Sequence, residues 1–161
     1  MKFKCAAANL DFLDEAPFQL EYLVDINASA LKTYQVLDDP ATWPLWFYGM
    51  SAATPLQQDD SGVWRKVTLN HFIDFREEFI VRESPHRLAY RVAAVSIPYA
   101  DELVECFDVE ETSHGVRVRY RIGLRVHKTL WPLKLVIKAI GKNAYKKSLH
   151  ALKVYIESIA D

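Results

Sequence analysis

Residues 116–126 read VRVRYRIGLRV, an alternation of apolar side chains with arginines that is typical of a half-buried β-strand. Such a strand belongs to an antiparallel sheet with one face buried and the other in water. From about residue 130 the apolar period becomes helical, and one stripe comprises Leu133, Ile137, Ile140, Ala144, Ser148, Leu152, Tyr155 and Ile159. A helix of roughly thirty residues, against an average of about twelve, needs a wide surface. We therefore expect it to pack on the sheet.

The segments upstream of this strand predict the rest of the architecture. A first strand is expected from Phe18 to Ile26, followed by a short helix from Ala30 to Leu37 that Ser29 caps, and by a second short helix from Ala41 to Tyr48. Four alternating runs then indicate strands at residues 63–69, 73–81, 88–94 and 103–109. Segregated strands and helices predict an α+β fold.

Length and composition limit the domain count and the compartment. A chain of 161 residues fits one domain, which we place at residues 18–161 after an N-terminal lead-in at residues 1–17. Lys and Arg total 20 and Asp and Glu total 21, so the sequence offers no electrostatic basis for binding nucleic acid. No apolar run approaches the length of a membrane span. We expect a cytoplasmic protein, and no feature indicates an oligomeric state.

Three segments carry a resemblance to a known family. The region from Ala28 to Trp46 ends in LDDPATWPLW at residues 37–46, Arg76-Glu77 precedes Ser84-Pro85, and an amphipathic helix runs from Leu149 to Ile156. Together they resemble the SRPBCC superfamily, the START or birch-pollen-allergen-like helix-grip fold, in its polyketide cyclase/dehydrase-like branch. The resemblance covers residues 18–158. It implies a curved antiparallel sheet wrapped around the long C-terminal helix, with a ligand cavity between them, but no particular reaction.

A row of polar residues is predicted to cross the inner face of the sheet. Keeping the apolar residues of one hairpin on one face places Arg65 opposite Glu77. Extending the register gives the row Arg65, Glu77, Val92, Glu105 and Tyr120. A buried carboxylate is costly unless paired, so Arg65 is expected to pair with Glu77 and the Tyr120 phenol to donate to Glu105. Three roles are open for this row. Its polar groups satisfy one another's hydrogen bonds, or they orient the polar end of a ligand, or Glu77 or Glu105 acts in acid–base catalysis.

Large aromatic residues and small helix residues bear on the cavity. The aromatics either fill a core or line a void, and Ala144 and Ser148 favour a void because they place small side chains in mid-helix. The expected cavity residues are Trp43, Trp46, Phe47, Arg65, Phe75, Glu77, Phe79, Tyr90, Val92, Glu105, Phe107, Tyr120, Ile137, Ile140, Ala144 and Ser148.

Other chemistry has little support in the sequence. Cys5 and Cys106 make no disulfide framework, the five histidines lack ligand spacing, and the five glycines form no phosphate loop, so we expect neither a metal nor a cofactor. A stripe of lysines is either a solvated face or, with Trp131 beside it, a docking surface for an anionic membrane or a protein: Lys134, Lys138, Lys142 and Lys146.

Three functions remain open. The first is a binding or carrier protein for a small hydrophobic molecule, lipid-like or aromatic. The second is a cyclase- or dehydratase-like enzyme that uses Glu77 or Glu105 as acid or base. The third is a co-chaperone-type interaction module that uses the convex face of the sheet. The absence of a strong acid–base pair in the sequence favours the first.

Overall fold

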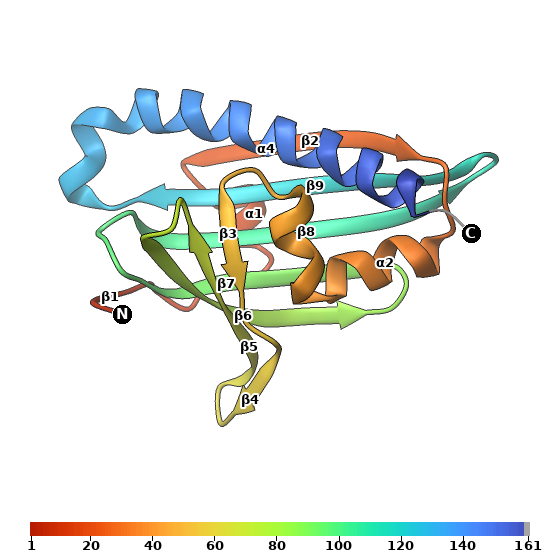
Figure 1. Ribbon diagram of the computed structural model, residues 1–161. Coiled ribbons are helices and arrows are strands. Elements are labelled where there is room, and N and C mark those ends of the chain that lie inside the picture. The colour runs from red at the N-terminus through yellow and green to blue at the C-terminus, as the bar shows by residue number, and fades with distance from the viewer. Residues whose placement is uncertain (160–161) are drawn as a thin grey trace.

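The computed structural model describes residues 1–159, and its helices and strands form the predicted α+β helix-grip fold (Figure 1). Residues 160–161, the last two of the predicted domain, lie outside the described residues. The elements are β1 (Phe3–Lys4), α1 (Phe12–Glu15), β2 (Phe18–Ile26), α2 (Ala30–Asp38), η1 (Pro40–Thr42), α3 (Trp43–Trp46), β3 (Met50–Ala53), β4 (Gln57–Asp59), β5 (Gly62–Leu69), β6 (Ile73–Glu83), β7 (Arg87–Val95), β8 (Ala100–Thr112), β9 (Gly115–Val126), η2 (Lys128–Leu133) and α4 (Lys134–Ser158).

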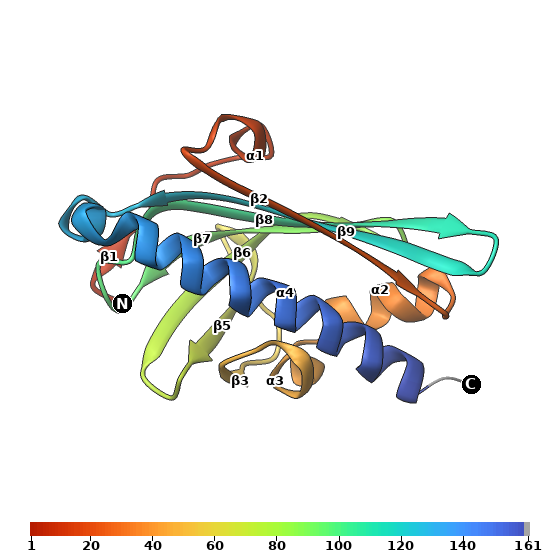
Figure 2. The ribbon, with the colours of Figure 1, turned by 90° about the horizontal axis from the view of Figure 1, so that it is seen from above.

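The strands form one curled antiparallel sheet. Its order is β2-β9-β8-β7-β6-β5-β3, with β1 paired to β7 and β4 paired to β5. β6 to β9 follow one another as a meander, and β2 closes the far side by pairing with β9 along its whole length. The curl leaves a concave face that α4 crosses diagonally (Figure 2).

The predicted register is correct between β5 and β6 and for Glu77 beside Val92 between β6 and β7, but wrong between β7 and β8 and between β8 and β9. Arg65 pairs with Glu77 as expected. However, Tyr90 rather than Val92 is the partner of Glu105, and Phe107 rather than Glu105 is the partner of Tyr120. Each error is a shift of two residues. Since side chains alternate with a period of two, such a shift keeps every side chain on its face, and alternation alone cannot detect it.

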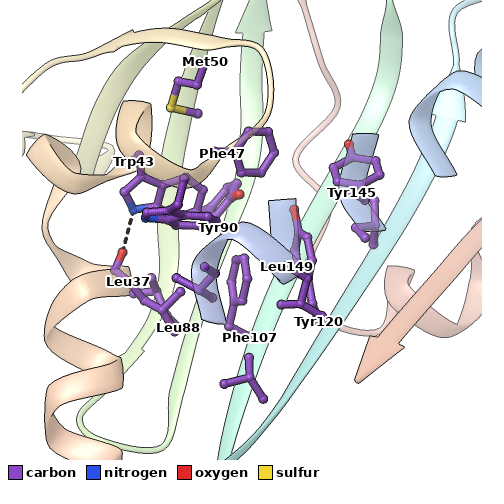
Figure 3. Close-up of a cluster of buried hydrophobic side chains, with 14 of the residues drawn as sticks. Leu37, Trp43, Phe47, Met50, Leu88, Tyr90, Phe107, Tyr120, Tyr145 and Leu149 are labelled. Carbon is purple, nitrogen blue, oxygen red and sulfur yellow. Dashed lines mark hydrogen bonds between the residues drawn. The ribbon is translucent and has the colours of Figure 1, made fainter. Parts of the chain in front are cut away.

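The short helices after β2 are built as the sequence predicts, except at their ends. The Ser29 hydroxyl caps α2 by accepting from the Lys32 amide at 3.2 Å. The second helix is shorter than predicted, because η1 and α3 replace one helix and the chain is already extended at Phe47. This arrangement buries Trp43 completely, and its indole Nε1 donates to the Leu37 carbonyl at 2.8 Å (Figure 3).

Helix α4 packs on the concave side, and its fully buried side chains all lie in its second half. Its buried side chains are Tyr145, Ser148, Leu149, Leu152 and Ile156. Of the predicted stripe, Ser148 and Leu152 are buried, whereas Leu133, Ile140 and Ile159 are exposed, Ile140 by 66%. The predicted stripe is exposed at Ile140 because this part of α4 lies over a cavity rather than over packed side chains.

The lead-in at residues 1–17 is an ordered part of the fold. β1 adds to β7, and α1 lies on the outer face of the sheet, where Phe12 and Leu13 pack against Val104 and Cys106. The close approach requires a glycine in β9, because a Cβ at Gly123 would lie 2.9 Å from the Phe12 carbonyl oxygen. The predicted water-facing side of the sheet is therefore covered in part.

Candidate ligand cavity

A cavity of about 320 Å³ lies between the concave face of the sheet and α4. Side chains from β5 to β8 form one wall, α4 forms the opposite wall, and the segment after α3 closes one side. The lining comprises Phe47, Tyr48, Gly49, Met50, Val67, Leu69, Asn70, Ile73, Phe75, Glu77, Val92, Tyr99, Leu103, Glu105, Ile137, Ile140, Gly141, Ala144 and Tyr145. Most of these side chains are apolar, and the charged ones are two carboxylates.

Glu105 lies at the centre of a cluster of tyrosines. Its Oε2 accepts hydrogen bonds from the phenols of Tyr90, at 2.5 Å, and of Tyr120, and its Oε1 accepts from Tyr145 at 3.3 Å. The phenols come from β7, β9 and α4, so the carboxylate joins the sheet to the helix. Charged hydrogen bonds of this kind are stronger than neutral ones.

The protonation of Glu105 is shifted by its surroundings. Burial raises the pKa of its carboxyl to about 7 and the nearby Glu77 carboxylate adds to the rise, while the hydrogen bonds from the three phenols oppose it. The pKa of Tyr145 is raised well above its usual value, first by burial and then by Glu105. The phenols therefore keep their protons at neutral pH and remain donors to Glu105.

Glu77 is held by a buried ion pair. The Arg65 Nε donates to Glu77 Oε2 at 2.6 Å, and the Arg65 side chain is fully buried. Burial raises the pKa of Glu77, and Arg65 counteracts the rise. The Arg65 guanidinium carbon lies 3.7 Å from the centre of the Trp43 ring, and among the described residues Nη1 and Nη2 have no hydrogen-bond partner. The cation–π contact with Trp43 compensates part of the cost of burying these unpaired donors.

The structure divides the predicted cavity residues into two groups. Those that line the cavity are Phe47, Phe75, Glu77, Val92, Glu105, Ile137, Ile140 and Ala144. Those that lie outside its wall are Trp43, Trp46, Arg65, Phe79, Tyr90, Phe107, Tyr120 and Ser148.

The second group builds the core beside the cavity. Trp43 contacts Trp46 and Phe107 through ring pairs at 4.5 and 5.8 Å, and Phe107 stacks on Tyr120 at 4.0 Å (Figure 3). Ser148 links α4 to the loop after α3, because its hydroxyl accepts a hydrogen bond from the Tyr48 amide at 2.9 Å. Arg65 and Tyr90 therefore act on the cavity indirectly, through Glu77 and Glu105.

Sequence reasoning missed several lining residues. Val67, Leu69, Ile73 and Leu103 are inward positions of the same alternation that identified their neighbours, so that pattern could have included them. Tyr145 follows Ala144 on α4 and was not part of the predicted apolar stripe. Tyr99 lies in the turn between β7 and β8, where no periodicity applies.

The part of α4 that lines the cavity lies beside exposed apolar residues and positive charge. Ile137, Ile140 and Gly141 of α4 line the cavity, and around them Leu133, Leu135, Val136 and Trp131 are exposed, Leu135 by 71%. Residues 128–146 contain five lysines and no acidic residue. The first half of α4 and η2 thus form a basic, apolar rim. Within residues 1–159 no helix has the length and hydropathy needed to cross a membrane.

The fold and the cavity together define a START-like helix-grip domain. The chain belongs to the family described as polyketide cyclase / dehydrase and lipid transport, whose model matches residues 17–157.

Proteins similar to this chain match most of its length. The uncharacterized protein Rv2574 of Mycobacterium tuberculosis is 24% identical over 158 residues, which cover 97% of this chain and 95% of that protein. A START superfamily protein from Mycobacterium smegmatis has a TM-score of 0.70 at 12% identity, with 88% of this chain and 99% of that chain covered. The di-domain ARO/CYC StfQ from the steffimycin biosynthetic pathway has a TM-score of 0.69 at 10% identity, with 87% of this chain and 51% of that chain covered.

Proposed function

We propose that the protein binds a small hydrophobic molecule in the cavity between the sheet and α4, as a binding or carrier protein. The observation that carries this proposal is an apolar cavity with a few buried polar groups, Glu77, Glu105 and Tyr145, at its wall. The volume of about 320 Å³ falls within the range of about 300–1,000 Å³ that small-molecule sites occupy. The family description, which includes lipid transport, supports the same function.

The rim of the cavity suggests where the ligand is exchanged. Exposed Trp131 and Leu135 are suited to the interface of a bilayer, and the five lysines of residues 128–146 complement an anionic surface. Because Ile137 and Ile140 belong both to this helix and to the cavity wall, docking would bring this wall close to the membrane. We therefore propose exchange of the ligand at an anionic membrane surface.

Two measurements test ligand binding. Native mass spectrometry of protein purified without detergent should show a bound small molecule. The neutral fluorescent probe N-phenyl-1-naphthylamine should gain fluorescence on binding at one site per chain. Protein that carries no extra mass and does not bind the probe would contradict the proposal.

Membrane exchange is tested by sedimentation with vesicles. The protein should sediment with vesicles that contain phosphatidylglycerol and not with phosphatidylcholine alone, and salt should weaken the binding. The combined variant Trp131→Ala, Leu135→Ser and Lys138→Glu should lose this binding but retain the probe. Leu31→Ser, which changes an exposed leucine on α2, is the matched control. Equal sedimentation of all proteins would reject this rim as the docking surface.

A second function is favoured by the pKa of Glu105. A carboxyl group whose pKa is about 7 is suited to acid–base catalysis, as the cyclase or dehydratase hypothesis requires. If the co-purifying molecule is transformed on incubation, Glu105→Gln should stop the change in mass while the molecule still binds. An unaltered molecule would favour binding alone.

A further inference from the structure

The charges of the cavity wall have one sign. Among the described residues that line it there is no Lys, Arg or His, and the charged side chains are Glu77 and Glu105. The other polar side chains in the lining, Tyr48, Asn70, Tyr99 and Tyr145, are neutral. The closest buried cation to this wall is Arg65, whose charge is balanced by Glu77 at 2.6 Å. The negative charge of Glu105 therefore has no cationic partner.

Glu105 has an acceptor position left over. An ionised carboxylate accepts about four hydrogen bonds, whereas within residues 1–159 the side-chain donors to Glu105 are three phenols. Two of them bind Oε2, and Oε1 receives only the 3.3 Å bond from Tyr145. Each phenol proton is directed at Glu105, so Tyr145 presents its oxygen to the cavity as an acceptor. These three phenols therefore have no proton left to donate to a ligand, whereas Tyr99, which also lines the cavity, keeps its phenol proton.

We propose that the cavity selects a neutral hydrophobic molecule with a hydroxyl group, an alcohol or a phenol, whose hydroxyl donates to Oε1 of Glu105. The inference rests on the proposed ligand binding and narrows it to one chemical class. A carboxylate ligand such as a free fatty acid is disfavoured, because its charge would face that of Glu105 in a buried site. An apolar ligand without a donor leaves the acceptor of Glu105 unsatisfied.

Three ligands of one chain length separate these effects. Decan-1-ol, its methyl ether and decanoate are allowed to compete with N-phenyl-1-naphthylamine at about pH 8, where most of Glu105 is ionised because its pKa is about 7. The alcohol should displace the probe at a concentration about tenfold lower than the ether, which has lost only the donor. Decanoate should be weaker than both.

Variants assign the selectivity to Glu105. Glu105→Gln removes the charge, so the difference between alcohol and ether should shrink and decanoate should improve relative to the alcohol. Glu102→Gln is the matched control, since Glu102 lies on the same strand and pairs with Arg125 instead of lining the cavity. The preference of this control variant for the alcohol over the ether and decanoate should equal that of the parent protein.

The outcomes distinguish this inference from the proposed function. If the ether or decanoate binds as tightly as the alcohol, the hydroxyl preference is wrong although the cavity binds ligands. If Glu105→Gln keeps the full preference, another group provides it and the assignment fails. If the parent protein binds neither probe nor ligand, the proposed function itself fails.

Discussion

Tyr120 donates a hydrogen bond to Glu105 although the two residues are not partners across β8 and β9. Tyr120 pairs with Phe107 and Glu105 pairs with Ile122, so the phenol reaches diagonally along the sheet. The Phe107 ring stacks on Tyr120 with an angle of 10° between the planes and fixes its direction. The carboxylate is thus held by a diagonal contact across β8 and β9 and by its cross-strand partner Tyr90 across β7 and β8.

Burial of Glu105 makes stability depend on pH. Its pKa is raised by folding from 4.5 to about 7, so its contribution to the free energy of unfolding is full below about pH 4.5 and is lost as the pH rises through 7. At about 1.4 kcal/mol per pKa unit, the loss amounts to about 3 kcal/mol. The free energy of unfolding of Glu105→Gln should therefore rise by that amount relative to the parent protein as the pH goes from 4.5 to 7. Urea denaturation across this range measures the difference, and parallel curves for the two proteins would contradict it.

The buried ion pair predicts a strong loss and a rescue. Arg65→Met leaves Glu77 buried without its partner and should lower the free energy of unfolding by about 3–5 kcal/mol. The double variant Arg65→Met/Glu77→Leu removes the stranded carboxylate and should recover most of the loss. Arg117→Ala breaks an exposed pair with Asp25 and should cost less than about 1 kcal/mol. A double variant no more stable than Arg65→Met would rule out this explanation.

Filling the cavity should weaken binding without unfolding the protein. Ala144 lines the cavity, so Ala144→Phe places its ring in empty space. The free energy of unfolding should change by less than the roughly 1–3 kcal/mol typical of overpacking a filled core. Binding of N-phenyl-1-naphthylamine should fall sharply. Ala139→Phe changes an exposed residue of the same helix and should bind the probe as the parent does.

The packing of α1 can be tested through a thiol. Cys106 is fully buried, and burial raises its pKa to about 11, so it should not react with thiol reagents in the native protein. Gly123→Ala forces α1 away, because the new Cβ would lie 2.9 Å from the Phe12 carbonyl oxygen. In a Cys5→Ser background, Cys106 should then become reactive. Gly141→Ala, whose Cβ makes an ordinary 3.6 Å contact with Tyr145, is the control. Equal reactivity in both variants would show that α1 does not protect the thiol.

Alternation and capping predicted much of this fold. The bounds of β2 match the predicted strand from Phe18 to Ile26, and Ser29 caps α2 as expected. Arg65 and Glu77 were correctly placed opposite each other, because a short hairpin leaves little freedom of register. The hydrogen bond from Tyr120 to Glu105 was also expected, but from a pairing that the structure does not have.

The errors arise where the sequence pattern is degenerate. A shift of two residues in the later ladders leaves every side chain on the same face of the sheet, so the sequence could not place Tyr90 beside Glu105. A pattern of apolar residues also cannot tell a filled core from a void. Trp43 and Phe107 fill the space beside the cavity, and only the three-dimensional packing reveals which side chains reach its wall.

The uneven packing of α4 has a consequence for motion. Its buried side chains all lie from Tyr145 onward, whereas the side chains of residues 134–143 are at most partly buried, and some of them line the cavity. Local opening is easiest where few apolar contacts hold an element. Backbone amides of residues 134–143 should therefore exchange hydrogen for deuterium well before those of residues 146–156. For the proposed ligand, the expected route of entry is then a transient fraying of half a helix, while the sheet and the other half stay closed.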